Sequence, residues 1–202
     1  AISLPERLLV VYTQSLRYLG IIVWGTAAGI AMLAPQIINL LFGSSFGPAI
    51  EVLQILAFAL PFIFLNEPGS RIMLVYDRYG QLLLALSGST VISISLDFLL
   101  VSPMGAKGIA ISYVISSSIL FVWIHFYAAR CISRLNILRV LIQPPIAAFV
   151  FLPMLVFKFV SPWVGLAAGV FLYISALIAF KAISPEELVL LYQGLRRYIF
   201  PK

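Results

Sequence analysis

Residues 109–129 read IAISYVISSSILFVWIHFYAA, and this stretch decides the class of the fold. It contains no Asp, Glu, Lys or Arg, and its length matches the roughly 20 apolar residues that a helix needs to cross a bilayer. Transmembrane barrel strands are shorter and alternate apolar with polar residues. The stretch is too continuous for that pattern, so we expect a transmembrane helix.

Five further stretches have the same character. The predicted spans are 18–41, 48–66, 80–101, 109–129, 140–157 and 162–180. The composition agrees: 62% of the residues are hydrophobic and only 10% are charged, against about 25% in a soluble domain. Disordered chains are poor in apolar residues, and one cysteine, Cys131, excludes a disulfide scaffold. The sequence predicts an all-α, polytopic membrane protein with about six transmembrane helices.

The basic residues predict how these helices cross the membrane. All of the 13 Lys and Arg residues except Lys107 and Lys158 fall on the side where residue 1 lies. Because cytoplasmic loops are enriched in Lys and Arg, both termini are expected to be cytoplasmic, in a cell membrane. The net charge of +6 then indicates anionic membrane lipids as partners rather than nucleic acid.

The two ends of the chain are predicted to lie outside the bilayer. Residues 1–17 form a cytoplasmic lead-in. Residues 184–202 begin Ser-Pro-Glu-Glu, a pattern typical of a helix start, and predict an interfacial helix or tail. The chain has no initiator Met and no signal peptide pattern, and we expect it to be a piece of a longer protein.

Small residues and prolines predict how the helices pack and bend. In lipid, close helix contacts form where small residues let backbones approach. The candidates are Gly25 with Gly29, Gly165 with Gly169, and the stripe Gly108, Ser112 and Ser116. Prolines inside spans should kink helices and release carbonyls that need other partners. They are Pro61, Pro144, Pro145 and Pro153.

Two acidic residues fall within predicted spans. Thr90, Ser93 and Asp97 share one helix face, which either packs on a neighbour or lines a wet cavity. Asp97 lies about 6 Å inside the end of span 80–101. It either reaches the membrane surface or serves as a cavity carboxylate. Glu51 falls in the first turn of span 48–66, where the helix dipole favours a carboxylate, and is interpreted as structural.

The candidate binding residues lie near the predicted cytoplasmic ends of spans. Glu67 and Arg71, four residues apart, either form a local ion pair or contact substrate. Arg17, Arg71 and Arg78 end or begin the first three spans and can cluster. Such a cluster either reflects the positive-inside pattern alone or binds a diphosphate through bidentate guanidinium contacts.

The chain offers little for catalysis. His125 is the sole histidine, has no Cys or carboxylate at ligand spacing, and is interpreted as an interfacial residue with a hydrated ring. Paired acidic residues that would hold a metal for sugar or prenyl transfer are missing, as is a glycine-rich phosphate loop. We predict no catalytic residues, no metal and no cofactor, and a protein that is not an enzyme.

Two phrases resemble a known family. Residues 35–46, PQIINLLFGSSF, lead into Pro48-Ala49 and LQILA at 53–57. Residues 99–112, LLVSPMGAKGIAIS, lead into span 109–129. Together with the lead-in from Leu4 to Arg17, they resemble the C-terminal half of polysaccharide and oligosaccharide-lipid flippases of the multidrug/oligosaccharidyl-lipid/polysaccharide exporter superfamily.

The resemblance implies a two-lobed transporter bundle of which this chain forms one part. It implies an N-terminal lobe as partner, an isoprenoid-diphosphate-linked glycan as substrate and alternating access as mechanism. Besides a passive scaffold subunit, two alternatives stay open. One is a cation-coupled drug antiporter of the same superfamily, for which Asp97 is the only available carboxylate. The other is a membrane-embedded glycan polymerase or transferase, which the missing acidic pairs disfavour.

Overall fold

The computed structural model describes residues 4–132, and within this range the chain is entirely helical, without strands. The elements are α1 (Leu4–Phe42), the 3₁₀ turn η1 (Ser44–Phe46), α2 (Pro48–Ala57), α3 (Leu60–Val75), α4 (Tyr79–Met104) and α5 (Ala106–Cys131). The all-α prediction is confirmed for this range.

Among residues 4–132, four segments are long and apolar enough to cross a membrane. They are Leu8–Phe42, Pro48–Val75, Tyr79–Met104 and Ala106–Cys131, and they correspond to the first four predicted spans. The predicted spans 140–157 and 162–180, their prolines, the Gly165 and Gly169 pair, and the segment 184–202 lie outside the described residues. A total of six spans and a two-lobed bundle therefore stay predictions.

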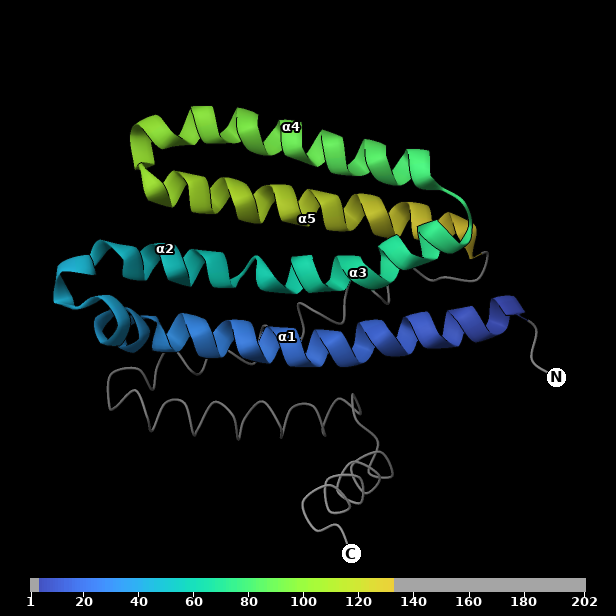
Figure 1. Ribbon diagram of the computed structural model, residues 1–202, viewed down its shortest axis with the longest axis horizontal. Helices are drawn as coiled ribbons and strands as arrows, with labels where there is room; N and C mark the ends of the chain where they lie inside the picture. Colours follow the sequence, from blue (N-terminus) through green and yellow to red (C-terminus); the bar gives the residue numbers. More distant parts are fainter. Residues whose placement is uncertain (1–3, 133–202) are drawn as a thin grey trace, which may run out of the picture. The chain divides into compact units, whose positions relative to one another are not determined.

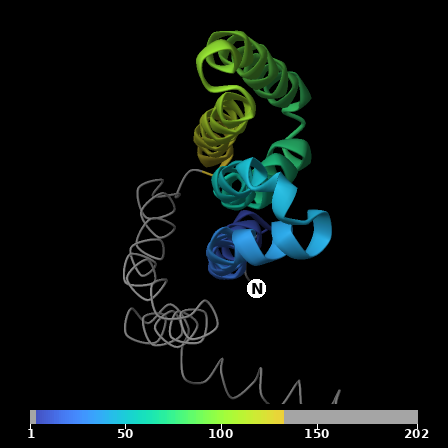
Figure 2. The ribbon, with the colours of Figure 1, turned by 90° about the vertical axis from the view of Figure 1, so that its left-hand side faces the viewer.

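The four spans form a single row in the order α1, α2–α3, α5, α4. Helix α5, the last of the described helices, lies between α3 and α4 (Figures 1 and 2). The helices lie side by side, so the bundle has two ends along the helix axes. The α1–α2 connection with η1 and the α4–α5 turn at Gly105 lie at one of them, here called the η1 end (Figure 1). The α3–α4 turn and Cys131 lie at the opposite end, here called the Cys131 end.

The faces of this row are strongly apolar. Large side chains point outward on its edge helices: Leu40 is 85% exposed, Phe98 79% and Leu99 70%. Water would oppose such a surface, because exposing apolar area costs free energy in proportion to that area. Together with the helix lengths, this surface makes the chain a membrane-embedded protein.

A hydrogen bond between α1 and α2 satisfies a backbone carbonyl that Pro35 leaves without a donor. Pro35 lies inside α1, has no N–H, and so leaves the carbonyl of Ala31, four residues earlier, without its helical donor. The Gln54 side-chain amide of α2 donates to that carbonyl oxygen at 3.1 Å. In lipid a free carbonyl must find a partner, so this bond ties α2 to α1.

Pro61 interrupts the second span, as predicted. It occupies the second position of α3 and cannot donate to the carbonyl of Ala57. The chain turns at Phe58 and Ala59, whose N–H groups bond the carbonyls of Ile55 and Leu56, three residues back. This tighter pattern ends α2 and starts α3 as a separate helix.

The interface between α4 and α5 confirms the predicted stripe of small residues. Gly108, Ser112 and Ser116 are all buried. A Cβ placed on Gly108 would lie only 2.2 Å from the carbonyl oxygen of Leu100, so α5 approaches the α4 backbone directly. Further along, the Ser89 hydroxyl donates to the Ser116 carbonyl at 3.0 Å. Small size and hydroxyl bonding together hold this pair.

Of the predicted glycine pair on α1, Gly29 makes no close contact within the described residues, so a helix contact through Gly25 and Gly29 stays a prediction. A Cβ on Gly29 would meet nothing within 4 Å. The buried stripe of α1 instead runs through Tyr12, Leu16, Val23, Ala27 and Ala34, and Gly29 lies off that stripe. Spacing alone does not tell which helix face meets a neighbour.

Candidate functional site

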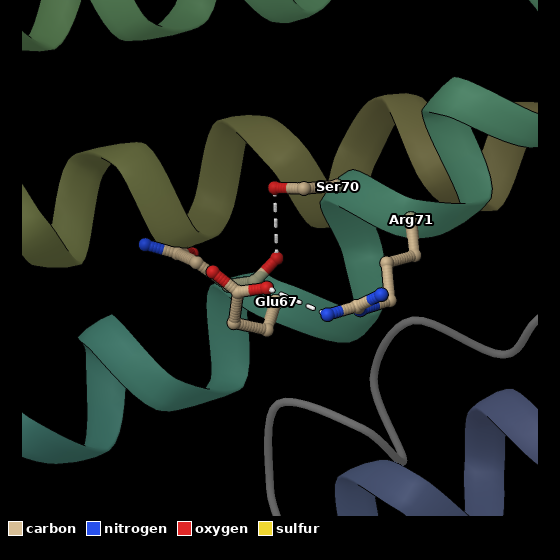
Figure 3. Close-up of polar contacts among 4 residues, drawn as sticks. Glu67, Ser70 and Arg71 are labelled. Atoms are coloured by element: carbon tan, nitrogen blue, oxygen red, sulfur yellow. Dashed lines mark hydrogen bonds and ion pairs between the residues drawn. The ribbon is translucent and has the colours of Figure 1, made fainter.

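The half of α3 toward the Cys131 end carries a dense group of polar residues (Figure 3). The Ser70 hydroxyl donates to the Asn66 carbonyl at 3.0 Å. Arg71 Nη2 lies 3.6 Å from Glu67 Oε2. Glu67 and Arg71 therefore form an ion pair across one turn of α3, and the helix continues through Pro68, which lies inside it.

This ion pair points away from the rest of the described bundle. The side chains of Glu67 and Arg71 are 64% and 78% exposed, whereas Leu65, Gly69 and Ile72 on the other side of α3 are buried. Glu67 lies eight residues and Arg71 four residues before the end of α3 at Val75, or about 12 Å and 6 Å along its axis. A charged pair at that depth does not face hydrocarbon, so it requires water or a polar partner.

Behind the ion pair, α3 packs closely on α5 through Gly69. A Cβ on Gly69 would lie 2.6 Å from Ile124 Cγ2 and 3.4 Å from His125 Cε1. His125 is only 3% exposed, and its ring lies 6.1 Å from that of Tyr12 on α1. The expectation of a hydrated, interfacial His125 is therefore wrong, because the missing side chain at Gly69 lets the imidazole enter the core.

Two buried polar atoms near this contact lack partners within the described residues. His125 Nδ1 lies 2.9 Å from the Phe121 carbonyl. A carbonyl only accepts, so Nδ1 carries the proton and Nε2 is left as an acceptor. Neither His125 Nε2 nor Asn66 Oδ1 has a hydrogen-bond partner. The inner face of the site is thus polar but incompletely satisfied.

The other two predicted arginines occupy separate elements. Arg17 lies on α1, with its guanidinium carbon 5.7 Å from the centre of the Tyr18 ring. Arg78 is exposed in the turn before α4, and its backbone N–H bonds the Met73 carbonyl at 2.8 Å. Clustering of these arginines with Arg71 stays a prediction.

Asp97 lies at the opposite end of the bundle and contacts α5. Its Oδ1 accepts a hydrogen bond from the Ser112 hydroxyl. Because α4 continues to Met104, Asp97 lies about 10 Å from the helix end, compared with about 6 Å from the end of the predicted span 80–101. Asp97 is half-buried, and Ser112 is fully buried.

The predicted polar face of α4 is only partly correct. Thr90 is exposed, and its hydroxyl bonds the Leu86 carbonyl of its own helix at 2.9 Å. Ser89, one position earlier, is the buried residue that reaches α5. Ser89 and Asp97 are eight residues apart and therefore also share a face, an alternative that the spacing allowed.

Glu51 confirms its predicted place in the first turn of the second span. Its carboxylate forms an ion pair with Lys107 in the first turn of α5. The two charges join α2 to α5 at the η1 end.

Among the described residues, no group of three or more His, Cys, Asp or Glu side chains lies close enough to hold a metal ion. No protein-family model, curated protein or solved structure matches the chain. The function therefore has to be inferred from the residues and their arrangement.

Proposed function

We propose that this chain is part of a membrane transporter that moves an isoprenoid-diphosphate-linked glycan across the cell membrane by alternating access. In this proposal the Glu67–Arg71 side of α3 lines the wet path. The observation that carries it is an exposed ion pair on a membrane helix, with Arg71 about 6 Å and Glu67 about 12 Å inside the end of α3. Charged residues at such depth mark substrate or ion pathways.

The interrupted second span supports a transport role. Transporter sites are commonly formed by discontinuous membrane helices, whose broken backbone lies beside the cavity. Here α2 and α3 are separated at Phe58 and Ala59, and the ion pair follows on α3. A break about two turns before the ion pair gives the span a point at which its two halves can tilt separately.

The two family-like phrases add support from their position. They contain Gly43 and Gly105, whose φ values of 83° and 56° fall in the left-handed region that glycine adopts readily. Both connections lie at the η1 end (Figure 1). The phrases therefore specify two sharp connections at one side of the bundle, which is a structural reason for their form.

The basic residues suggest where transport begins. Arg17, Arg71, Arg78 and Arg130 all belong to the half of the bundle toward the Cys131 end, and Lys107 belongs to the η1 end. By the positive-inside rule the Cys131 end is cytoplasmic. Arg71 then lies at the cytoplasmic mouth, where a diphosphate-linked glycan made in the cytoplasm would enter, and its planar guanidinium suits a diphosphate.

A conservative substitution tests the proposal. Arg71→Lys keeps the charge but removes the bidentate fork. In the assembled transporter, reconstituted in vesicles, we expect it to lower translocation of a fluorescent prenyl-diphosphate glycan by about 10- to 150-fold, the value of one charge-assisted hydrogen bond. Membrane insertion and abundance should stay normal.

Arg130→Lys is the matched control. Arg130 is exposed at the end of α5, stacks over Phe126 at 4.1 Å and has no place in the proposed path. Its transport should equal that of the wild type. If Arg71→Lys also transports at the wild-type rate, Arg71 is a topology signal only and the proposed path along α3 is wrong.

The cation-coupled drug antiporter remains the second candidate, and one observation favours it. Asp97 lies about 10 Å inside the end of α4 and contacts α5, a place that suits a carboxylate for cation coupling. Efflux of a cationic dye that depends on a proton or sodium gradient, with no glycolipid translocation by the same vesicles, would select this candidate.

A further inference from the structure

The contact between Asp97 and Ser112 contains two hydrogen-bonding options but a single hydroxyl proton. Ser112 Oγ is within hydrogen-bonding distance of Asp97 Oδ1 and lies 3.0 Å from the carbonyl oxygen of Ile109. A serine hydroxyl donates one hydrogen bond and accepts up to two. It therefore cannot donate to both oxygens at once.

We propose that Asp97, Ser112 and the Ile109 carbonyl form a proton-binding site between α4 and α5, in which protonation reverses the Asp97–Ser112 hydrogen bond. When Asp97 is ionised, Ser112 donates to Asp97 Oδ1. When a proton from water binds the carboxylate, the Asp97 hydroxyl donates to Ser112 Oγ, and the Ser112 hydroxyl rotates to donate to Ile109. No bond other than the transferred O–H forms or breaks.

Because the Ser112 hydroxyl is buried, it needs a hydrogen-bond partner in both protonation states of Asp97. Ser112 is 0% exposed, so its hydroxyl has no water with which to replace a lost partner, and an unsatisfied buried polar group costs free energy. Both protonation states of Asp97 leave Ser112 with a bonded hydrogen. A serine in this position is therefore matched to a carboxyl group that changes its charge.

The residues that follow Asp97 face outward from the described row of helices. Asp97 precedes Phe98 and Leu99, which are 79% and 70% exposed on the edge helix of the described row. An ionised carboxylate beside hydrocarbon is expensive, and neutralisation removes most of that cost. A neutral Asp97 permits α4 to face lipid, whereas an ionised one requires water at the same place.

No cation on the packed helices balances Asp97 among the described residues. On α5, Lys107 is occupied by Glu51 of α2, Tyr113 adjoins Ser112, and His125 and Arg130 lie at least about 20 Å along the helix. On α3, Glu67 and Arg71 lie in the half toward the Cys131 end. On α4 itself, Asp97 is the only Asp, Glu, Lys or Arg.

Infrared difference spectroscopy of the full chain in lipid vesicles tests this site. On acidification we expect a carbonyl band of a protonated carboxyl group that disappears in Asp97→Asn. In Ser112→Ala the band should move, because its hydrogen-bond acceptor is gone. Ser118→Ala is the matched control, since the Ser118 hydroxyl bonds only the Ile115 carbonyl of its own helix, and it should leave the band in place.

Three outcomes would overturn the site. One is a band that persists in Asp97→Asn. Another is a band that Ser112→Ala and Ser118→Ala affect equally, since Ser112 would then have no special contact with the carboxyl group. The third is suppression of the band by sodium at constant pH, which would indicate a metal cation as the ligand. None of these measurements requires transport, so the site can fail while the proposed function stands, and the reverse.

Discussion

The two ends of the described bundle use charged and hydroxyl groups in opposite ways. At the η1 end, Glu51 pairs with Lys107 and Asp97 binds Ser112, so the polar groups join one helix to another. Toward the Cys131 end, the Glu67–Arg71 pair stays within α3 and is directed outward. The first arrangement stabilises the bundle, and the second leaves two charges available to water or to a ligand.

The difference follows from where the small residues lie. Gly108 brings α5 against the backbone of α4, and at that distance Ser112 reaches Asp97. Gly69 brings α3 against α5 on its buried side, which turns Glu67 and Arg71, on the other side of α3, away from the neighbouring helix. The glycines thus decide which polar groups become internal contacts and which remain exposed.

Thiol labelling tests whether the two ends of the bundle lie on opposite sides of the membrane. We expect a membrane-impermeant maleimide to label Cys131, the only thiol, from the cytoplasmic side alone. In a Cys131→Ser background, Ser45→Cys, exposed in η1, should be labelled from outside alone. The effect is all or none. Labelling of both sites from the same side would mean that the two ends do not lie on opposite sides of the membrane.

The largest expected effect on stability comes from a substitution in the contact between α4 and α5 at the η1 end. Gly108→Ala places a methyl group 2.2 Å from a backbone oxygen, and neither atom belongs to a flexible side chain. Overpacking of this kind costs about 3 kcal/mol, measured as the free energy of unfolding in a detergent titration.

Gly29→Ala provides the control for that substitution. No atom lies within 4 Å of the added methyl group, and alanine is the better helix former, so stability should be unchanged or slightly raised. Equal losses from both substitutions would mean that Gly29 packs on a part of the chain beyond residue 132, and that the predicted glycine contact on the first span is correct.

The residue types predicted where the helices lie in the sequence. They were less informative about which face of each helix packs against a neighbour. A helix that crosses a bilayer needs only length and apolar character, and residues 109–129 have both. Faces are harder, because residues one position apart, such as Ser89 and Thr90, point in different directions, and which one meets α5 depends on how the helices dock. The helices also extend past the predicted spans, since apolar runs end before the hydrogen-bonded helix does.

The candidate site was predictable only as a set of residues. The spacing of Glu67 and Arg71 indicated their ion pair. Its exposure followed from Gly69 on the opposite side of α3, a long-range contact with α5 that spacing does not reveal. The burial of His125 has the same cause. Ser112 was predicted as a packing residue, and its bond to Asp97 requires the two helices to be placed side by side.

A smaller effect is expected where a side chain repairs a proline defect. Gln54→Leu removes the donor to the Ala31 carbonyl and should cost about 1 kcal/mol, near the upper range of hydrogen bonds between membrane helices. In a Pro35→Ala background the residue at position 35 supplies its own N–H to Ala31, so Gln54→Leu should then cost little. A full and equal loss in both backgrounds would show that Gln54 stabilises the bundle by packing alone.

The smallest stability effect, and the sharpest test of the comparison, comes from exchanging the charges of each pair. Glu51→Lys with Lys107→Glu keeps an ion pair between the same two helix starts. The helix dipole then disfavours the new lysine in the first turn of α2 and favours the new glutamate in the first turn of α5, so the two changes offset. We expect stability within about 0.5 kcal/mol of the wild type and unchanged glycan transport.

The matching exchange on α3 should separate stability from transport. Glu67→Arg with Arg71→Glu should likewise change stability by no more than about 0.5 kcal/mol, the value of one exposed pair across a helix turn. Transport should nevertheless fall, because the guanidinium moves by one turn, about 5.4 Å, away from a bound diphosphate. If both exchanges leave transport intact, the outward pair on α3 is a packing element like the pair at the η1 end, and the two ends of the bundle do not differ in function.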